Sequence, residues 1–112
     1  MHVEPGERGA TTIADRVVAK IASQAAREAL GPLPPDAAPP QAAVVVHRGV
    51  ARVRLLVDLP YPQDIGACCR AVRRRVVERV GALAGMRVPE VAVRVERLHP
   101  APAHGAVQGR TP

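Results

Sequence analysis

An apolar stripe with the spacing of an α-helix is the first clear pattern in the chain. Apolar side chains recur every three or four positions over residues 12–30, which predicts an amphipathic helix. Thr12 and Asp15 have the spacing of a capping box at its start, and Gly31 ends it. We expect the stripe to face the core, and its members are Ile13, Val17, Ile21 and Ala25, widened by Val18, Ala22 and Ala29.

A proline-rich segment and a β-hairpin are predicted next. Residues 31–41 are rich in proline, which favours an extended, semi-rigid linker. The apolar run 42–47 and the alternating segment 50–59 predict two strands, since a period of two places polar side chains on one face of a sheet. The residues His47-Arg48-Gly49 between them predict a hairpin turn, because glycine adopts positive φ.

The second half of the chain predicts a long helix and a final strand. Pro60-Tyr61-Pro62 ends the preceding strand, and the helix that follows ends near Gly85. Residues 88–98 alternate between apolar and charged side chains, which is typical of a strand. The predicted core stripe of the helix consists of Ile65, Cys69, Val72, Val76, Val80 and Leu83, with Cys68 at its border.

The order of these elements, α-β-β-α-β, predicts an α/β fold of the α+β type. It consists of a three-stranded mixed sheet covered by two amphipathic helices. A chain of 112 residues is long enough for one domain. We place that domain at residues 12–98, and we expect residues 1–11 and 99–112 to be disordered tails.

The core available to this domain is thin. Val and Ala dominate the apolar residues, the chain has no Phe or Trp, and Tyr61 is its only aromatic residue. Small side chains bury less apolar area, and each Å² contributes only about 25 cal/mol. We therefore expect modest stability, completed by a partner or by self-association.

Arginine is the most concentrated charged residue type. The formal net charge is +6, and Lys20 is the only cation that is not arginine. Five arginines on the polar sides of predicted elements form a candidate partner or anion-binding surface: Arg52, Arg54, Arg70, Arg73 and Arg74. A solvated helix face in a protein from a GC-rich genome explains the same composition without a ligand.

Residues for catalysis do not gather in any known pattern. The four histidines are scattered, and none has the spacing of a metal ligand set. Cys68 and Cys69 fit a core role, with a reactive thiol beside the arginines as the alternative. Asp58 and Asp64 flank the strand-to-helix turn, which we expect them to orient. We therefore predict no enzymatic activity, no cofactor, no metal and no small-molecule substrate.

The N-terminal sequence and the cysteines favour a cytoplasmic location. The first residues contain no apolar region of a signal peptide, and no apolar run approaches the roughly 18 residues of a membrane span. Adjacent cysteines rarely form a disulfide with each other, which suits a reducing compartment. Attachment to a membrane would then have to go through the surface of the protein or through a partner.

Three stretches of the sequence resemble one known family. They are IADRVVAKIASQAAREALG (13–31), VARVRLLVDLPYPQDI (50–65) and CCRAVRRRVVERVGALAGMRVPEVAVRVERL (68–98). Together they resemble the alkaline-shock-protein family, also called the Gls-type envelope stress response proteins of Gram-positive bacteria. The arginine-rich composition is similar to that of actinobacterial proteins.

This resemblance implies a non-catalytic protein of cell-envelope homeostasis. It implies a homo-oligomer, or a scaffold that docks to a membrane-anchored protein partner at the inner face of the membrane. The alternative from the residues themselves is a nucleic-acid-binding module that uses the arginines of the second helix. The element order also resembles KH domains. However, the close glycines at a helix terminus, Gly81 and Gly85, have the wrong spacing for their GXXG loop, and no aromatic residues are available for stacking.

Overall fold

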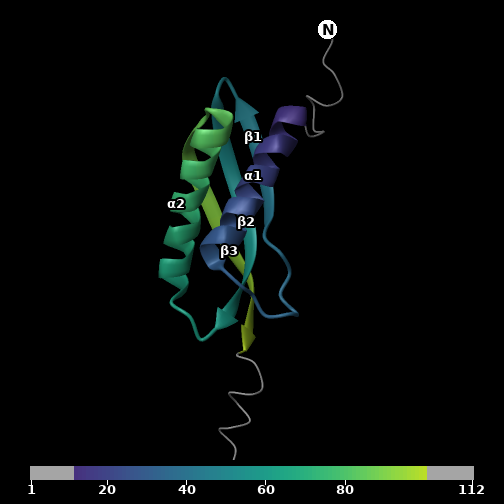
Figure 1. Cartoon of the computed structure of the whole chain (residues 1–112), viewed down its shortest axis with the longest axis vertical. Helices are drawn as coiled ribbons and strands as arrows, with labels where there is room; N and C mark the ends of the chain where they lie inside the picture. Colours follow the sequence, from purple (N-terminus) through teal and green to yellow (C-terminus); the bar gives the residue numbers. More distant parts are fainter. Residues whose placement is uncertain (1–11, 101–112) are drawn as a thin grey trace, which may run out of the picture.

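A computed structural model describes residues 12–100 and contains five elements in the expected order. They are α1 Ile13–Leu30, β1 Gln41–His47, β2 Val50–Tyr61, α2 Ile65–Ala84 and β3 Arg87–Pro100. Both helices lie on the same face of the sheet, so the domain has two layers (Figure 1). The predicted α+β class and the α-β-β-α-β order are confirmed.

β2 is the central strand of the three-stranded sheet. β1 pairs with it antiparallel and β3 pairs with it parallel, which makes the sheet mixed as predicted. His47 pairs with Val50, and the two residues between them, Arg48 and Gly49, have φ values of 52° and 76°. Positive φ at both central positions matches the twist of a two-residue hairpin, so the predicted turn is confirmed.

The start of α1 is capped as the sequence predicts. The Asp15 backbone N–H donates to Thr12 Oγ1 at 3.0 Å, and the Thr12 N–H donates to Asp15 Oδ2 at 3.3 Å. Asp15 Oδ1 also accepts a hydrogen bond from the backbone N–H of Val46 at 3.0 Å. One carboxylate therefore satisfies the helix terminus and fixes α1 against β1.

The core between the two layers is built from small apolar side chains. The central strand directs every second side chain from Ala51 to Leu59 toward the helices, and α2 packs a single stripe against them. Each buried Val or Leu contributes roughly 1.5–3 kcal/mol relative to an exposed one. The largest fully buried side chains of β2 and α2 are Val53, Leu55, Val57, Leu59, Val72, Val76 and Val80.

The predicted apolar stripe of α1 is only partly buried. Ile13 is 74% exposed and Val17 is 52% exposed, Ile21 is half-buried, and Ala25 is 1% exposed. This order follows from helix geometry, because a step of four residues advances 400° and the row drifts by about 40° per step. The row therefore winds from the outer surface of α1 toward the core. Val18 and Ala22, which widen the stripe, are buried as predicted together with Ala25, and Ala26 is buried in addition.

The stripe of α2 needs a similar correction at its two ends. Ile65 is 38% exposed and Leu83 is 65% exposed, although both were expected in the core. Cys68 packs against the buried cluster. The middle of the predicted stripe is confirmed, since Val72, Val76 and Val80 are fully buried.

The last strand is longer than predicted. β3 continues through His99 and Pro100, which pair with Pro60 and Tyr61 of β2. The expectation that the C-terminal tail starts at His99 was therefore wrong, because a longer β2 supplies partners for these residues. The remaining tail residues, 1–11 and 101–112, lie outside the part that the structure describes.

Candidate interaction surfaces

Arg52 and Arg54 lie on the open face of the sheet, which the helices do not cover. Arg54 stands between Ala43 of β1 and Ala92 of β3, its cross-strand neighbours. Arg52 lies beside Glu90, with 3.7 Å between Arg52 Nε and Glu90 Oε1. Both arginines are exposed, as the alternation of β2 predicts.

Two shallow hollows flank Arg54 on this open face. Their volumes are about 450 and 430 Å³, and both are lined by Ala43 and Arg54. The short alanine side chains leave room beside the guanidinium, which could receive a carboxylate or phosphate oxygen. The neighbouring Val45 is 64% exposed, so the open face combines cations with an apolar side chain.

Arg70, Arg73 and Arg74 lie on the opposite side of the protein. They are exposed on α2, together with Val77, on the side away from the buried valines. Spacings of three, four and seven residues place all four side chains on one face of the helix. The structure therefore exposes all five predicted arginines but divides them between two surfaces, because the sheet and α2 separate them.

The other two arginines of α2, Arg75 and Arg79, form ion pairs within the fold. Glu28 of α1 accepts from Arg75 Nη1 and from Arg79 Nε, both at 3.1 Å. Arg79 Nη2 also lies 3.1 Å from the same Glu28 oxygen. This carboxylate links the two helices, and it leaves Arg70, Arg73 and Arg74 as the cations of α2 without a carboxylate within 4.0 Å among residues 12–100.

A third surface, which the sequence did not reveal, is formed by the two helices. We call it the helix seam: the exposed or half-buried apolar residues Ile13, Val17 and Ile21 of α1 with Leu83 of α2. Ile21 and Leu83 line one hollow of about 270 Å³ between the helices. The sequence pattern predicts that this stripe faces the core, so it does not identify the seam. The drift of a four-residue period was the signal that could have identified it.

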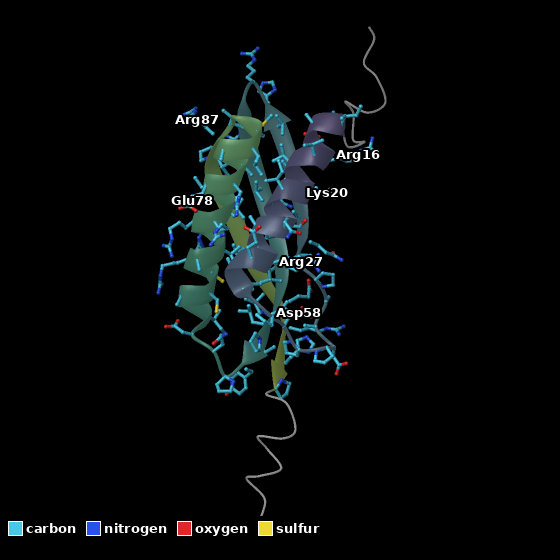
Figure 2. All side chains as sticks on the ribbon, viewed as in Figure 1. Arg16, Lys20, Arg27, Asp58, Glu78 and Arg87 are labelled. Carbon is cyan, nitrogen blue, oxygen red and sulfur yellow. The ribbon has the colours of Figure 1, made fainter. Side chains whose placement is uncertain are left out.

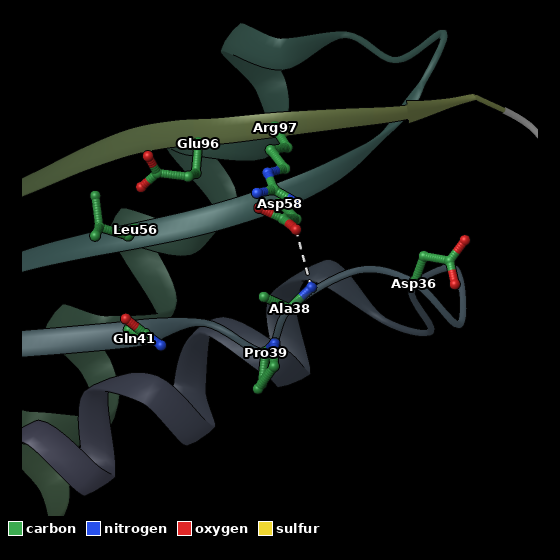
Figure 3. Close-up of a pocket in the computed structure, with 8 residues that line it drawn as sticks. All are labelled: Asp36, Ala38, Pro39, Gln41, Leu56, Asp58, Glu96 and Arg97. Atoms are coloured by element: carbon green, nitrogen blue, oxygen red, sulfur yellow. Dashed lines mark hydrogen bonds between the residues drawn. The ribbon is translucent and has the colours of Figure 1, made fainter.

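The one buried charge in the described residues is Asp58, at the end of the open face. Asp58 is 3% exposed, and its Oδ2 accepts from the Ala38 backbone N–H at 2.9 Å (Figure 3). The same oxygen lies 2.8 Å from Nε2 of His99. The hydrogen bond from Ala38 lowers the pKa of Asp58, His99 and Arg97 act in the same direction, and burial opposes them.

This cluster corrects the predicted role of Asp58. Asp58 holds the proline-rich segment against the sheet instead of orienting the strand-to-helix turn. Asp64 does orient that turn, since its Oδ1 accepts from the Ala67 N–H at 3.0 Å and caps α2. A hollow of about 210 Å³ lies beside Asp58, with Arg97 and Glu96 in its wall.

The sequence raised two kinds of reactive group, a metal centre and a reactive thiol. Within residues 12–100, His, Cys, Asp and Glu form no cluster of three that could hold a metal ion. Burial raises the pKa of the Cys68 thiol, and Cys69 and Asp64 add to the effect. A raised pKa reduces the thiolate fraction, which is the reactive species.

No model of a known protein family matches the chain, and no curated protein matches it significantly. Neither α1 nor α2, the two helices of the described residues, is long and apolar enough to cross a membrane.

Proposed function

We propose that this protein is a non-catalytic association module of cell-envelope homeostasis. It works in the cytoplasm, at the inner face of the membrane, by self-association or by docking to a membrane-anchored protein partner. The resemblance of residues 12–98 to the alkaline-shock-protein family supports this proposal.

The helix seam is the observation that carries the proposal. Exposed apolar side chains that occur singly are common, but here Ile13, Val17 and Leu83 are all more than half exposed on one helix layer. A core without Phe or Trp buries little apolar surface area. Apolar side chains that stay in water then forgo stabilisation that the fold needs, unless a partner covers them.

The test is a crosslinked capture of the tagged protein from its own cells, with membrane fractions compared before and after nuclease treatment. Wild type is compared with Val17→Glu in the seam and with Val77→Glu, an exposed valine on the outer face of α2. We expect wild type and Val77→Glu to capture the same integral membrane protein or a second copy, and Val17→Glu to lose it. Equal capture by all three would contradict the proposal.

Nucleic-acid binding is the second candidate function. Its support is the cationic face of α2 formed by Arg70, Arg73 and Arg74, which have no carboxylate of residues 12–100 within 4.0 Å. Binding of this kind depends steeply on salt concentration, because phosphate contacts release counterions. Capture that disappears with nuclease and with Arg73→Glu/Arg74→Glu would favour this function over the first.

A further inference from the structure

We propose that the helix seam binds an amphipathic α-helix whose apolar stripe is flanked by acidic residues. This inference rests on the proposed function and names the chemistry of the partner. The bound helix would lie on the outer side of the helix layer, against residues of both α1 and α2.

The apolar part of the seam has the spacing that receives a helix. Ile13, Val17 and Ile21 follow one another at intervals of four residues, over about 12 Å of α1. Leu83 continues the surface onto α2, across the hollow that it shares with Ile21. Helices that bind in grooves insert apolar side chains at intervals of three and four residues, and two or three such anchors match this length.

A row of cations runs beside the apolar row. Arg16, Lys20 and Arg27 are exposed and follow one another along α1 (Figure 2). At 100° and 1.5 Å per residue, Arg16 lies about 4.5 Å along the helix from Ile13 and about 60° around it, and Lys20 is placed in the same way relative to Val17. Arg27 lies about 9 Å beyond Ile21 along the helix. No carboxylate of residues 12–100 lies within 4.0 Å of these three side chains. The rim of the seam on this side is therefore positive.

Within the described residues, the two acidic side chains of α1, Asp15 and Glu28, already have partners. The Asp15 carboxylate accepts hydrogen bonds from the backbone N–H groups of Thr12 and Val46. The Glu28 carboxylate accepts hydrogen bonds from Arg75 and Arg79. Opposite charges across an interface favour association, whereas like charges disfavour it. The complementary partner carries carboxylates beside its apolar stripe.

The same charges argue against a second copy of the chain at the seam. A two-fold contact brings the same patch of both copies together. It would place two rows of Arg16, Lys20 and Arg27 near each other, with no free carboxylate of residues 12–100 between them. Self-association through another surface, such as the open face of the sheet, is unaffected by this argument.

The experiment uses two designed helical peptides that share one leucine stripe and differ only in their flanking residues, Glu in one and Lys in the other. Binding of each to the full chain is measured by fluorescence anisotropy, and backbone amide shifts in NMR spectra locate it. We expect the Glu peptide to bind roughly tenfold more tightly than the Lys peptide, with salt weakening it. The shifts should centre on Val17, Ile21 and Leu83.

Matched variants separate the apolar and the charged contributions. Val17→Glu should weaken the Glu peptide roughly tenfold or more, and Val77→Glu should not change it. Arg16→Glu/Lys20→Glu should reverse the preference toward the Lys peptide, whereas Arg73→Glu/Arg74→Glu on α2 should leave it unchanged. Circular dichroism checks that each variant is folded.

The outcomes distinguish this inference from the proposed function. Equal binding of both peptides, or shifts that centre on the open face, would overturn the inference. So would seam shifts that grow with the concentration of the protein alone, because the occupant would then be a second copy. If Val17→Glu abolishes cellular capture but the charge reversal leaves capture intact, the association function stands and the acidic-helix partner is wrong.

Discussion

The carboxylate of Asp58 and the imidazole of His99 meet at 2.8 Å, between the ends of β2 and β3. Asp58 Oδ2 also accepts the backbone N–H of Ala38, so one oxygen connects both strands with the proline-rich segment. A buried carboxylate without partners would cost several kcal/mol. The contacts therefore make this end of the sheet depend on three segments that are distant in sequence.

Replacing Asp58 by Ala should destabilise the domain by roughly 3 kcal/mol. The change removes a charged acceptor and leaves the Ala38 N–H without its partner. Urea unfolding measures the loss, and hydrogen exchange of the Ala38 amide should accelerate. Asp36→Ala is the matched control, since Asp36 is exposed in the same segment and lines the same hollow. Equal losses in both variants would contradict the role of Asp58.

The pH dependence of stability should contain a contribution from Asp58. Its pKa is lowered in the folded protein, so the folded state binds this proton less readily than the unfolded chain. The stabilisation is complete above the unfolded pKa of about 3.9 and is lost as the pH falls through the folded value. Asp58→Asn should flatten this acid limb of the stability curve, and an unchanged limb would contradict the assignment.

Much of the fold could be predicted from the sequence because local signals agreed. The capping box at Thr12, the glycine turn at Gly49 and the alternation of β2 each depend on neighbouring residues, and each is confirmed. The order of the elements then left few arrangements for a three-stranded sheet with two helices.

The surfaces were harder to predict because they depend on how the helices pack on the sheet. The sequence indicates that Arg54 and Arg74 are both exposed, but only the layers place them on opposite sides. The drift of the α1 row decides that Ile13 faces water and Ala25 faces the core. The contact between Asp58 and His99 joins residues 41 positions apart, and no local pattern records it.

The two faces of α2 should respond differently to a charge. Val76→Asp places a carboxylate at a fully buried position of a thin core, so we expect a loss of at least about 3 kcal/mol or failure to fold. Arg74→Asp changes an exposed position and should cost less than about 0.5 kcal/mol. Thermal unfolding compares them, and similar melting temperatures would contradict the assignment of the faces.

The Cys68 thiol should react slowly while the protein is folded. Burial raises its pKa and limits access, so both thiolate fraction and exposure are reduced. Alkylation of Cys69→Ser at pH 7.5, followed by mass spectrometry, measures Cys68 alone. The alkylation rate should rise several-fold in urea. In the folded protein, the midpoint of the increase in rate with pH should lie above that of a free thiol. Fast labelling of the folded variant would instead support a reactive cysteine.

Glu28 should stabilise the packing of α1 against α2 to a small, salt-dependent extent. It bridges Arg75 and Arg79 at 3.1 Å, but its side chain is 32% exposed and those of the arginines are 39% and 43% exposed. Solvent screening therefore limits the expected loss in Glu28→Gln to about 0.5–1 kcal/mol at low salt. Urea unfolding at low and high salt measures it. Glu78→Gln is the control, because Glu78 lies 3.9 Å from Arg75 within α2 and connects no second element. A larger loss at high salt than at low salt would show that the contribution of Glu28 is not electrostatic.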